Sequence, residues 1–314
     1  MIIKDTPILR KYISVNGSVE FDNVKSYLRK AERNFLKPLI GTDQLTVFES
    51  DQTDAIIKEA QELAREAVAN FGYYLYLPIG AVQLSDKGIY VAESEHTKSA
   101  SDKQFKELQR SFKKSGHEAL DELLEVMEKS ADKFSDWFSS DCYTVYKELL
   151  VNKTSTFNKW FYIFNSRQTF VALKPNIQIT EDRFILNVIG ANLLLALKNS
   201  QTVTERKKVK ELLQKSIVAF TIMLTVDNGM FVLDAKGIHM KFDALPYEST
   251  VTNINLKVND FLTRTKANKR TEGEEYLKMA MEIVKENPTH FSEYEIKEEK
   301  KHLKITNTKS LVGL

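Results

Sequence analysis

Hydrophobic residues recur at helical spacing along three long stretches in the first half of the chain. The stretch "DNVKSYLRKAERNFLKPLI" (22–40) predicts a helix that Pro38 and Gly41 end. The stretch 52–77 predicts a second helix, which becomes apolar on all sides near its end and should be the most buried part of the domain. The stretch 99–134 predicts one long helix or two, with Gly116 as the candidate break. The apolar positions at helical spacing are Val24, Leu28, Ala31, Phe35 and Leu39 in the first stretch and Ile56, Ala60, Leu63, Ala67 and Phe71 in the second.

A different pattern lies between the second and third stretches. In "AVQLSDKGIYVAE" (81–93) apolar residues alternate on both sides of Ser-Asp-Lys-Gly, which predicts a β-hairpin with a type I turn and a bulge. Gly88 should then take the left-handed conformation that a side chain disfavours. Nearly the same motif returns at "LDAKGI" (233–238), where Gly237 takes the place of Gly88.

The likeness extends far beyond the hairpin motif. A shift of 149 positions aligns 11–91 with 160–240 without a gap, and 20 of the 81 pairs are identical, against about five expected from ordinary residue usage. Gly41 then pairs with Gly190. After the hairpin, a further shift of eight residues aligns 118–137 with 275–294. The repeated unit has about 150 residues, so the chain is a duplicated domain and not a short solenoid repeat.

We therefore predict a mainly α fold with small β-hairpins (α+β), built from two tandem, duplicated helical-bundle domains with one inserted hairpin each. The expected divisions are a first domain at 1–150 with its hairpin near 79–93, a second at 151–294 with its hairpin near 229–242, and a C-terminal arm at 295–314. Where the second domain begins, the apolar run "NKWFYIFNS" (158–166) is typical of a strand. The arm starts highly charged and ends mildly apolar, as a segment that orders against a partner would.

Composition narrows the class of protein. The 314 residues are 42% hydrophobic, enough for a sizeable core, and 45 Lys and Arg residues nearly balance 43 Asp and Glu residues. A net charge of +2 gives no long-range attraction for nucleic acid. The single cysteine, Cys142, favours a cytosolic assembly site, and the apolar part of the N-terminus is too short for a signal peptide. No apolar run is long enough to cross a membrane, so we expect no membrane partner.

The sequence offers little for catalysis. No nucleotide-binding glycine loop is present, and the five histidines do not fall at metal-ligand spacing. Cys142 is expected to be a buried structural thiol, because no partner for a nucleophile can be identified. Paired carboxylates such as those in "DELLE" (121–125) lie in a lysine-rich helix and are typical of a solvated face. We therefore expect no enzyme, no cofactor and no catalytic, cofactor-binding or metal-binding residue.

Several segments of the first domain carry a family resemblance. "YLRKAERNFLKPLIG" (27–41), "AREAVANFGYYLYLPIGAVQLSDKGIYVAES" (64–94) and "ASDKQFKELQRSFKKSGHEALDELLEVME" (100–128) resemble a family found in phages and prophages of Bacteroidetes. That family is similar to the head–tail connector (adaptor, neck-ring) proteins of tailed phages and resembles the ring proteins of crAss-like phages. The likeness covers most of 10–130 and, through the internal repeat, reaches 160–294.

The resemblance implies a helical adaptor of the connector type that assembles as a closed ring, usually twelve-fold, beneath the portal protein. It implies a virion protein of the neck or tail, assembled in the host cytoplasm, which lines the channel through which DNA passes. Its partners would be further copies of itself, the portal protein, other neck or tail proteins and, transiently and without specificity, the passing DNA. Connectors of this kind are commonly about half as long, so the fused duplication leaves the copy number open.

Residues in the turns are the candidates for structural and assembly roles. The proposed structural turn glycines are Gly41, Gly88, Gly190 and Gly237. A lone two-stranded hairpin is marginal in water, so each hairpin should pack either on its own helices or on a neighbouring subunit. In the second case the candidate assembly contacts are Ser85, Asp86, Lys87, Asp234 and Lys236.

Two other classes of function stay open at this point. A DNA- or RNA-binding accessory protein would use the basic runs "ERKKVK" (205–210) and "KANKR" (266–270), although nearby acidic residues weaken their field. An enzyme would need convergent polar groups in a pocket, and no motif of the sequence indicates them.

Overall fold

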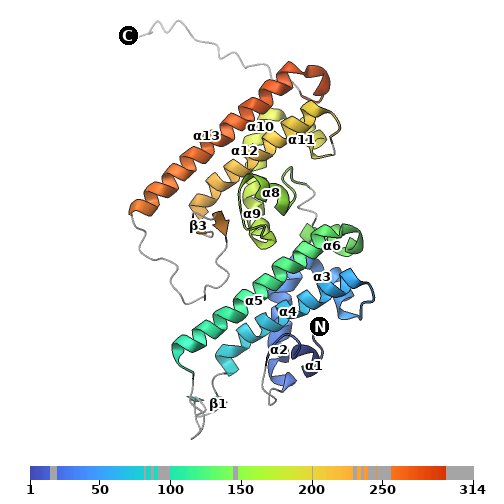
Figure 1. Ribbon diagram of the computed structural model, residues 1–314, viewed down its shortest axis with the longest axis vertical. Coiled ribbons are helices and arrows are strands. Elements are labelled where there is room, and N and C mark those ends of the chain that lie inside the picture. Colours follow the sequence, from blue (N-terminus) through green and yellow to red (C-terminus); the bar gives the residue numbers. More distant parts are fainter. Residues whose placement is uncertain are drawn as a thin grey trace, which may run out of the picture.

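The computed structural model describes residues 1–14, 20–80, 83–85, 88–90, 100–143, 148–199, 201–228, 232–234, 237–239, 245 and 256–294. The chain is mostly helical, as predicted. Two helical bundles follow one another along the longest axis of the molecule, the first half of the chain forming one and the second half the other (Figure 1). In each bundle two long helices lie side by side and run in similar directions in the two halves: α4 with α5, and α12 with α13.

The element order repeats from one half to the other. The first repeat contains α1 (Thr6–Leu9), α2 (Phe21–Ala31), the π-helix η1 (Glu32–Leu36), α3 (Lys37–Glu49), α4 (Ala55–Gly80), α5 (Asp102–Lys129), the 3₁₀-helix η2 (Ala131–Lys133) and α6 (Ser135–Ser139). The second repeat contains α8 (Thr154–Trp160), α9 (Arg167–Thr180), the π-helix η3 (Glu181–Ile185), α10 (Leu186–Ile189), α11 (Ala191–Lys198), α12 (Thr204–Asn228), α13 (Leu256–Glu286) and the 3₁₀-helix η4 (Pro288–His290).

Short strands follow α4 and α12. Strand β1 (Gln83–Ser85) pairs antiparallel with β2 (Gly88–Tyr90), and β3 (Val232–Asp234) pairs antiparallel with β4 (Gly237–His239). The two registers correspond, because Ser85 lies opposite Gly88 and Asp234 lies opposite Gly237. Residues 86–87 and 235–236, which would form the turns, lie outside the described residues. The bulged hairpins therefore stay a prediction.

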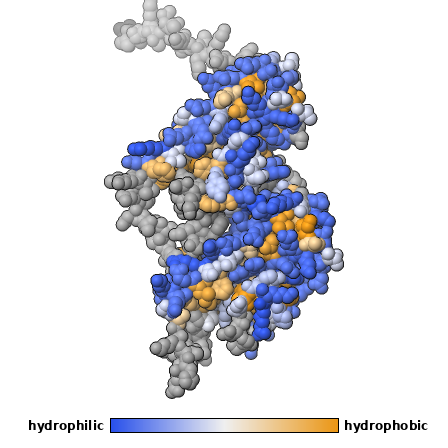
Figure 2. All heavy atoms as spheres, in the orientation of Figure 1, coloured by the Kyte–Doolittle hydropathy of each residue, from blue (hydrophilic) through white to orange (hydrophobic). Residues whose placement is uncertain are grey.

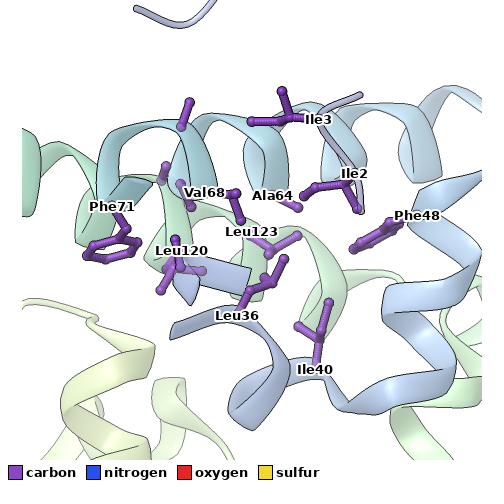
Figure 3. Close-up of a cluster of buried hydrophobic side chains, with 14 of the residues drawn as sticks. Ile2, Ile3, Leu36, Ile40, Phe48, Ala64, Val68, Phe71, Leu120 and Leu123 are labelled. Carbon is purple, nitrogen blue, oxygen red and sulfur yellow. The ribbon is translucent and has the colours of Figure 1, made fainter. Parts of the chain in front are cut away.

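Each bundle has its own hydrophobic core. The buried side chains of one cluster come from positions 2–137 and those of the other from 149–291. In the first core, shown in Figure 3, Phe71, Val68 and Ala64 of α4 face Leu120 and Leu123 of α5. Ile2 and Ile3 and the side chains of Leu36, Ile40 and Phe48 close this core from the N-terminal segment, η1 and α3. Leu149 and Leu150 already belong to the second core, which therefore begins slightly before the predicted division at 150.

The helix predicted at 22–40 does not end at Pro38. It passes from α2 into the five-residue π-helix η1 and continues as α3, with Pro38 in the first turn of α3. The chain bends instead at Gly41, which has φ 81° and ψ 174°. The second repeat reproduces this geometry with η3 and with Gly190 at φ 81° and ψ 160°. This combination of angles is nearly restricted to glycine.

An aromatic ring lies against bare helix backbone in each bundle. Phe71 on α4 stacks on Phe35 of η1, with ring centroids 4.0 Å apart and an interplanar angle of 5°. The other side of the ring lies close to Gly116 of α5, where an added Cβ would come within 2.9 Å of the ring atoms. In the second repeat Phe220 stacks on Phe184 at 4.5 Å, and a Cβ at Gly273 would come within 2.7 Å of the ring.

This packing explains the presence of Gly116 in a helix. Of the two predicted alternatives, one long helix or two with a break at Gly116, the single helix is confirmed. Helix α5 is continuous from Asp102 to Lys129, and Gly116 is buried in it. The helix starts at a capping box in which the Ser101 hydroxyl accepts from the backbone N–H of Gln104, and the Gln104 side chain accepts from the N–H of Ser101.

The strand predicted at 158–166 was also wrong. Helix α8 occupies Thr154–Trp160, and a tight turn follows in which Phe164 and Asn165 have φ angles of 57° and 53°. The Asn158 side chain holds this turn, because its Oδ1 accepts hydrogen bonds from the backbone N–H groups of Ile163 and Asn165, both at 3.0 Å. Aromatic residues favour strands on average, but here the local asparagine bonds decide the backbone.

We predict that Gly116→Ala and Gly273→Ala each destabilise the protein by about 1–3 kcal/mol, because the new methyl group collides with a ring that is itself held by a second ring. Alanine in place of glycine inside a helix ordinarily stabilises by about 0.5–1 kcal/mol, so the sign of the effect tests the packing. Urea unfolding followed by circular dichroism measures it. As a matched control, Phe71→Leu should remove most of the additional cost of Gly116→Ala. An increase in stability for both alanine variants would contradict the packing.

Candidate functional site

The segment that enters each repeat is held by the same pair of positions. The carboxylate of Glu32, the first residue of η1, accepts a hydrogen bond of 2.7 Å from the backbone N–H of Ile2, and Glu181 of η3 does the same for Leu150, also at 2.7 Å. The carbonyl of the same entering residue accepts from a side chain of the long helix, namely from Arg65 Nε at 3.1 Å onto Ile2 and from Gln214 Nε2 at 3.0 Å onto Leu150. Burial raises the pKa of the Glu32 carboxyl, and the N–H of Ile2 opposes that shift.

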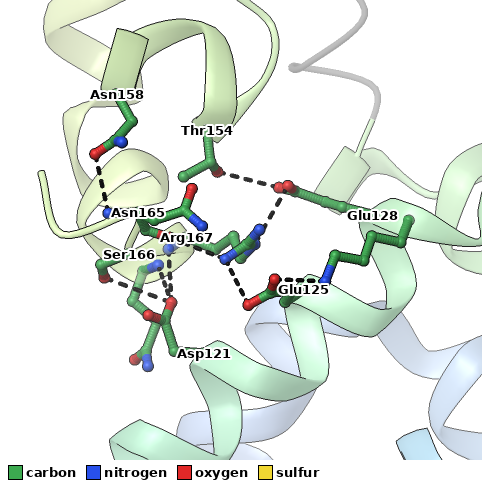
Figure 4. Close-up of polar contacts among 10 residues, drawn as sticks. Asp121, Glu125, Glu128, Thr154, Asn158, Asn165, Ser166 and Arg167 are labelled. Carbon is green, nitrogen blue, oxygen red and sulfur yellow. Dashed lines mark hydrogen bonds and ion pairs between the residues drawn. The ribbon is translucent and has the colours of Figure 1, made fainter. Parts of the chain in front are cut away.

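A polar cluster joins the two repeats. Asp121 lies on α5 of the first repeat, and its Oδ1 accepts hydrogen bonds from the backbone N–H groups of Arg167 at 2.6 Å and Gln168 at 3.0 Å (Figure 4). These are the first N–H groups of α9, so a carboxylate of the first repeat caps a helix of the second. Ser166 completes the cap, because its hydroxyl accepts from the N–H of Thr169 at 3.1 Å.

Arg167 is the centre of this cluster. Its side chain is only 7% exposed, and its Nη1 lies 3.0 Å from Glu125 Oε2 while its Nε lies 3.4 Å from Glu128 Oε2. Glu128 also accepts a hydrogen bond of 3.2 Å from the hydroxyl of Thr154 on α8 (Figure 4). Burial raises the pKa of Asp121 and Glu128, whereas the hydrogen bond from Lys129 lowers that of Glu125. The guanidinium thus forms ion pairs with two carboxylates of the first repeat.

His117 lies one turn before Asp121 on the same helix and makes a further tie. Its Nδ1 is 2.8 Å from Gln168 Oε1, and the Gln168 amide donates to the backbone carbonyl of His117. Because the amide oxygen is an acceptor, Nδ1 carries the proton of the neutral ring. The rings of His117 and Phe71 make an edge-to-face contact, with centroids 4.9 Å apart and an interplanar angle of 83°. Burial lowers the pKa of His117 from 6.5 to about 4, so the imidazole is neutral at physiological pH.

A pocket of about 310 Å³ opens beside Arg167. It is lined by Glu125, Glu128, Lys129, Tyr143, Asn152, Lys153, Ser155, Asn165 and Arg167. Arg167 and Lys129 both pair with carboxylates in its wall. The ion pairs in the wall of this pocket therefore join α5 of the first repeat to α9 of the second.

Lys174 on α9 is a further buried cation near the joint. Its Nζ donates to the backbone carbonyl of Cys142 at 3.4 Å, and burial lowers its pKa from 10.5 to about 8. Cys142 is half-buried, and its thiol is 3.9 Å from the position of a Cβ at Gly41. Both residues therefore contribute to the packing between the end of the first repeat and the start of the second.

The joint between the repeats is not itself repeated. At the positions that correspond to Asp121 and Glu128, helix α13 carries Lys278 and Lys285, and both are exposed. A lysine cannot accept hydrogen bonds from the first N–H groups of a helix. The second repeat therefore cannot offer the same cap to a following module.

The residues predicted from the sequence as sites lie elsewhere. Gly41 and Gly190 both have a φ of 81° at the bend of their repeat. Gly88 and Gly237 begin β2 and β4, and Ser85 and Asp234 end β1 and β3. Asp86, Lys87 and Lys236 lie outside the described residues, so the assembly contacts stay a prediction. Within the described ranges, no group of three His, Cys, Asp or Glu side chains could hold a metal ion. No helix in that part of the chain is long and apolar enough to cross a membrane.

Asp121→Ala should destabilise the protein by about 1–3 kcal/mol, because the N–H groups of Arg167 and Gln168 lose their acceptor in a buried place. Glu118→Ala is the matched control, since Glu118 lies on the same helix but is exposed and pairs with Lys114 at 3.6 Å. That control should change the free energy of unfolding by less than about 0.5 kcal/mol. Equal effects of the two substitutions in urea unfolding would contradict the capping role.

In the His117→Gln variant, the free energy of unfolding should fall less as the pH is lowered from 7 to 4. The folded-state pKa of about 4 lies below the ordinary 6.5, so the contribution of the neutral imidazole is fully present above pH 6.5 and is lost as the pH falls towards 4. Between pH 7 and pH 4, wild-type protein should lose up to about 3 kcal/mol relative to the variant. Asp121 and Glu128 titrate in both proteins, so the difference isolates the imidazole. Urea unfolding at the two pH values measures this difference. Equal losses of unfolding free energy in the wild type and the variant would show that His117 is not held neutral.

Two segments of the chain, 32–147 and 178–303, each match the family of unknown function DUF6712. No curated protein matches the chain, and no solved structure does. The first match begins at η1 and the second three residues before η3, so the family's domain lies at corresponding places in the two repeats. Together the matches cover well over half of the residues. The chain therefore belongs to the DUF6712 family, whose domain it contains twice.

Proposed function

We propose that this protein is a structural subunit of a phage virion, a head-to-tail connector or neck-ring protein. It assembles as a closed ring below the portal and lines the channel through which DNA passes. Two kinds of support exist for this function: the resemblance of 27–41, 64–94 and 100–128 to connector-like families, and an uneven distribution of apolar surface between the two repeats.

The uneven apolar surface is the observation that carries the proposal. Among the described residues, the large hydrophobic side chains that stay exposed in the first repeat are Ile79 and Leu108. In the second repeat they are Tyr162, Phe164, Ile179, Val188, Leu195, Phe261 and Met279. The two repeats share one architecture, so this difference is not a requirement of the fold. Apolar surface beyond what the fold requires is typical of a protein that buries it against partners.

The polar interactions fit the same function. Arg167 of the second repeat pairs with Glu125 and Glu128 of the first, and these pairs tie the two domains together. A subunit with two modules of one architecture, joined by hydrogen bonds and ion pairs, suits head-to-tail packing into a ring, in which each copy meets the next through two different faces. A near-neutral charge suits a channel wall, because phosphate contacts from many Lys and Arg residues would hold the DNA in place.

The interactions of the two basic runs argue against the alternative function, that of a nucleic-acid-binding protein. In the first run Arg206 pairs with Glu293 at 3.0 Å, and Lys210 donates to the backbone carbonyl of Asn199 at 3.0 Å. In the second run Lys269 pairs with Glu272 and Arg270 pairs with Glu274. Several of these positive charges are therefore paired with carboxylates of the same chain, which weakens their attraction for phosphate.

Native mass spectrometry of the purified full-length chain tests the proposal. We expect a closed oligomer with one dominant copy number, and ring-shaped particles in negative stain. Binding to a fluorescent DNA duplex, measured by anisotropy at increasing salt, should be weak and should depend little on salt. A chain that stays monomeric at every concentration, or an affinity for DNA that falls steeply with salt, would favour the alternative function.

A further inference from the structure

The bend at Gly41 in the first repeat is covered by the end of that repeat. Trp137 on α6 is buried, and its Nε1 donates a hydrogen bond of 2.9 Å to the carbonyl of Leu39. Beyond α6, the Ser140 side chain is 3.4 Å from the position of a Cβ at Gly41. The covering segment, 137–143, ends in Tyr143, which packs against both hydrophobic cores. It lies where the first repeat leads into the second.

The corresponding face of the second repeat has no such cover among the described residues. A Cβ added at Gly190 would meet no atom within 4 Å. Leu195 on α11 is 67% exposed and Val188 on α10 is 37% exposed. We call Val188, Gly190, Ala191 and Leu195 the α10–α11 face. Figure 2 shows a mostly hydrophilic surface on which hydrophobic residues gather in a few places, one of them at the end of the upper bundle that holds α11.

The composition of this face also differs from that of its counterpart. Thr42 and Thr46 of α3 are exposed, whereas Ala191 and Leu195 take their places in the second repeat. The repeat with less cover thus carries the more apolar face. Because the burial of exposed leucine and valine side chains away from water is favourable, the face is better suited to contact with an apolar segment.

The chain after η4 is a poor cover for its own repeat. Phe291 is buried like its counterpart Phe134, and Tyr294 stands at the position of Trp137. The next six residues, "EIKEEK" (295–300), then replace "FSSDCY" (138–143). Five of the six are charged, and burial of unpaired charges is unfavourable. Apolar residues return only later in the C-terminal segment, at Leu303, Ile305, Leu311, Val312 and Leu314.

We propose that residues 303–314 of a second copy of this chain dock on the α10–α11 face. In the first repeat, Leu39 and Gly41, the counterparts of Val188 and Gly190, lie under the segment that leads to the next module. In the proposed ring, the module next to the second repeat belongs to another copy. The eight residues 295–302, six of them Lys or Glu, can span up to about 26–29 Å when extended, enough to reach a neighbour. The inference rests on the proposed ring and names one contact within it.

Site-specific photo-crosslinking tests the contact. Leu195 is replaced by p-benzoylphenylalanine in full-length protein, and equal amounts of ¹⁴N- and ¹⁵N-labelled chains are mixed before assembly and illumination. We expect mass spectrometry to find crosslinks of mixed isotope composition between position 195 and residues 303–314. The same photoreactive residue at Thr46, the matched position of the first repeat, should give no crosslink to that segment.

A substitution gives an independent measurement. Leu195→Glu should raise the concentration at which half of the rings dissociate by about tenfold or more, whereas Thr46→Glu should leave it nearly unchanged. Both positions are exposed, and circular dichroism checks that both variants are folded.

The outcomes separate the contact from the function. Rings that form with intrachain crosslinks, with crosslinks to other segments, or with equal sensitivity to the two glutamate variants would overturn the docking of 303–314 in a second copy and leave the ring intact. A chain that never associates would overturn both. Mixed-isotope crosslinks together with selective weakening by Leu195→Glu would support the contact.

Discussion

Each repeat depends on one phenylalanine ring that fills the space between three helical elements. Phe71 can lie between η1 and α5 only because Gly116 leaves the backbone of α5 bare, and Phe220 lies in the same way against Gly273. The close approach brings the two long helices into contact along their length. The π-helix at the start of each bend is part of the same arrangement, because it carries Phe35 or Phe184 to the opposite side of the ring. A side chain at Gly116 or Gly273 would therefore disturb the helix pair, the bend and the aromatic stack together.

The buried carboxylates of Glu32 and Glu181 show a second constraint that both repeats keep. Each repeat begins with a short segment that has no helix of its own to satisfy its backbone, and each supplies an acceptor for the N–H and a donor for the C=O of the same residue. The donor differs between the repeats, arginine in one and glutamine in the other. The acceptor is glutamate in both. The geometry has thus been retained while the chemistry at one position has changed.

Much of the architecture could be predicted from the sequence, because helical periodicity and internal alignment are local or one-dimensional signals. The alignment of 11–91 with 160–240 predicted the duplication, and the pairing of Phe71 with Phe220 was visible in it. The role of Gly116 stayed open, because in a sequence a glycine that breaks a helix cannot be told from one that leaves room for a ring. The run at 158–166 was misjudged because two hydrogen bonds accepted by the Asn158 side chain outweigh the strand propensity of its aromatic residues. Nothing in the local pattern around Asp121 distinguishes it from a solvated helix face, since its partners lie more than 40 positions away. One signal was available: Asp121 aligns with Lys278, which indicates that the two halves use this helix face differently.

Because two modules are fused in one chain, an assembly of whole chains contains two modules for every chain. The cap that Asp121 provides exists once per polypeptide, so in a closed head-to-tail ring, as proposed, joints made within a chain would alternate with different joints made between chains. Such an object always contains an even number of modules, and its rotational order equals the number of chains, half the number of modules. A partner with one binding site per chain would therefore meet only every second module around the axis.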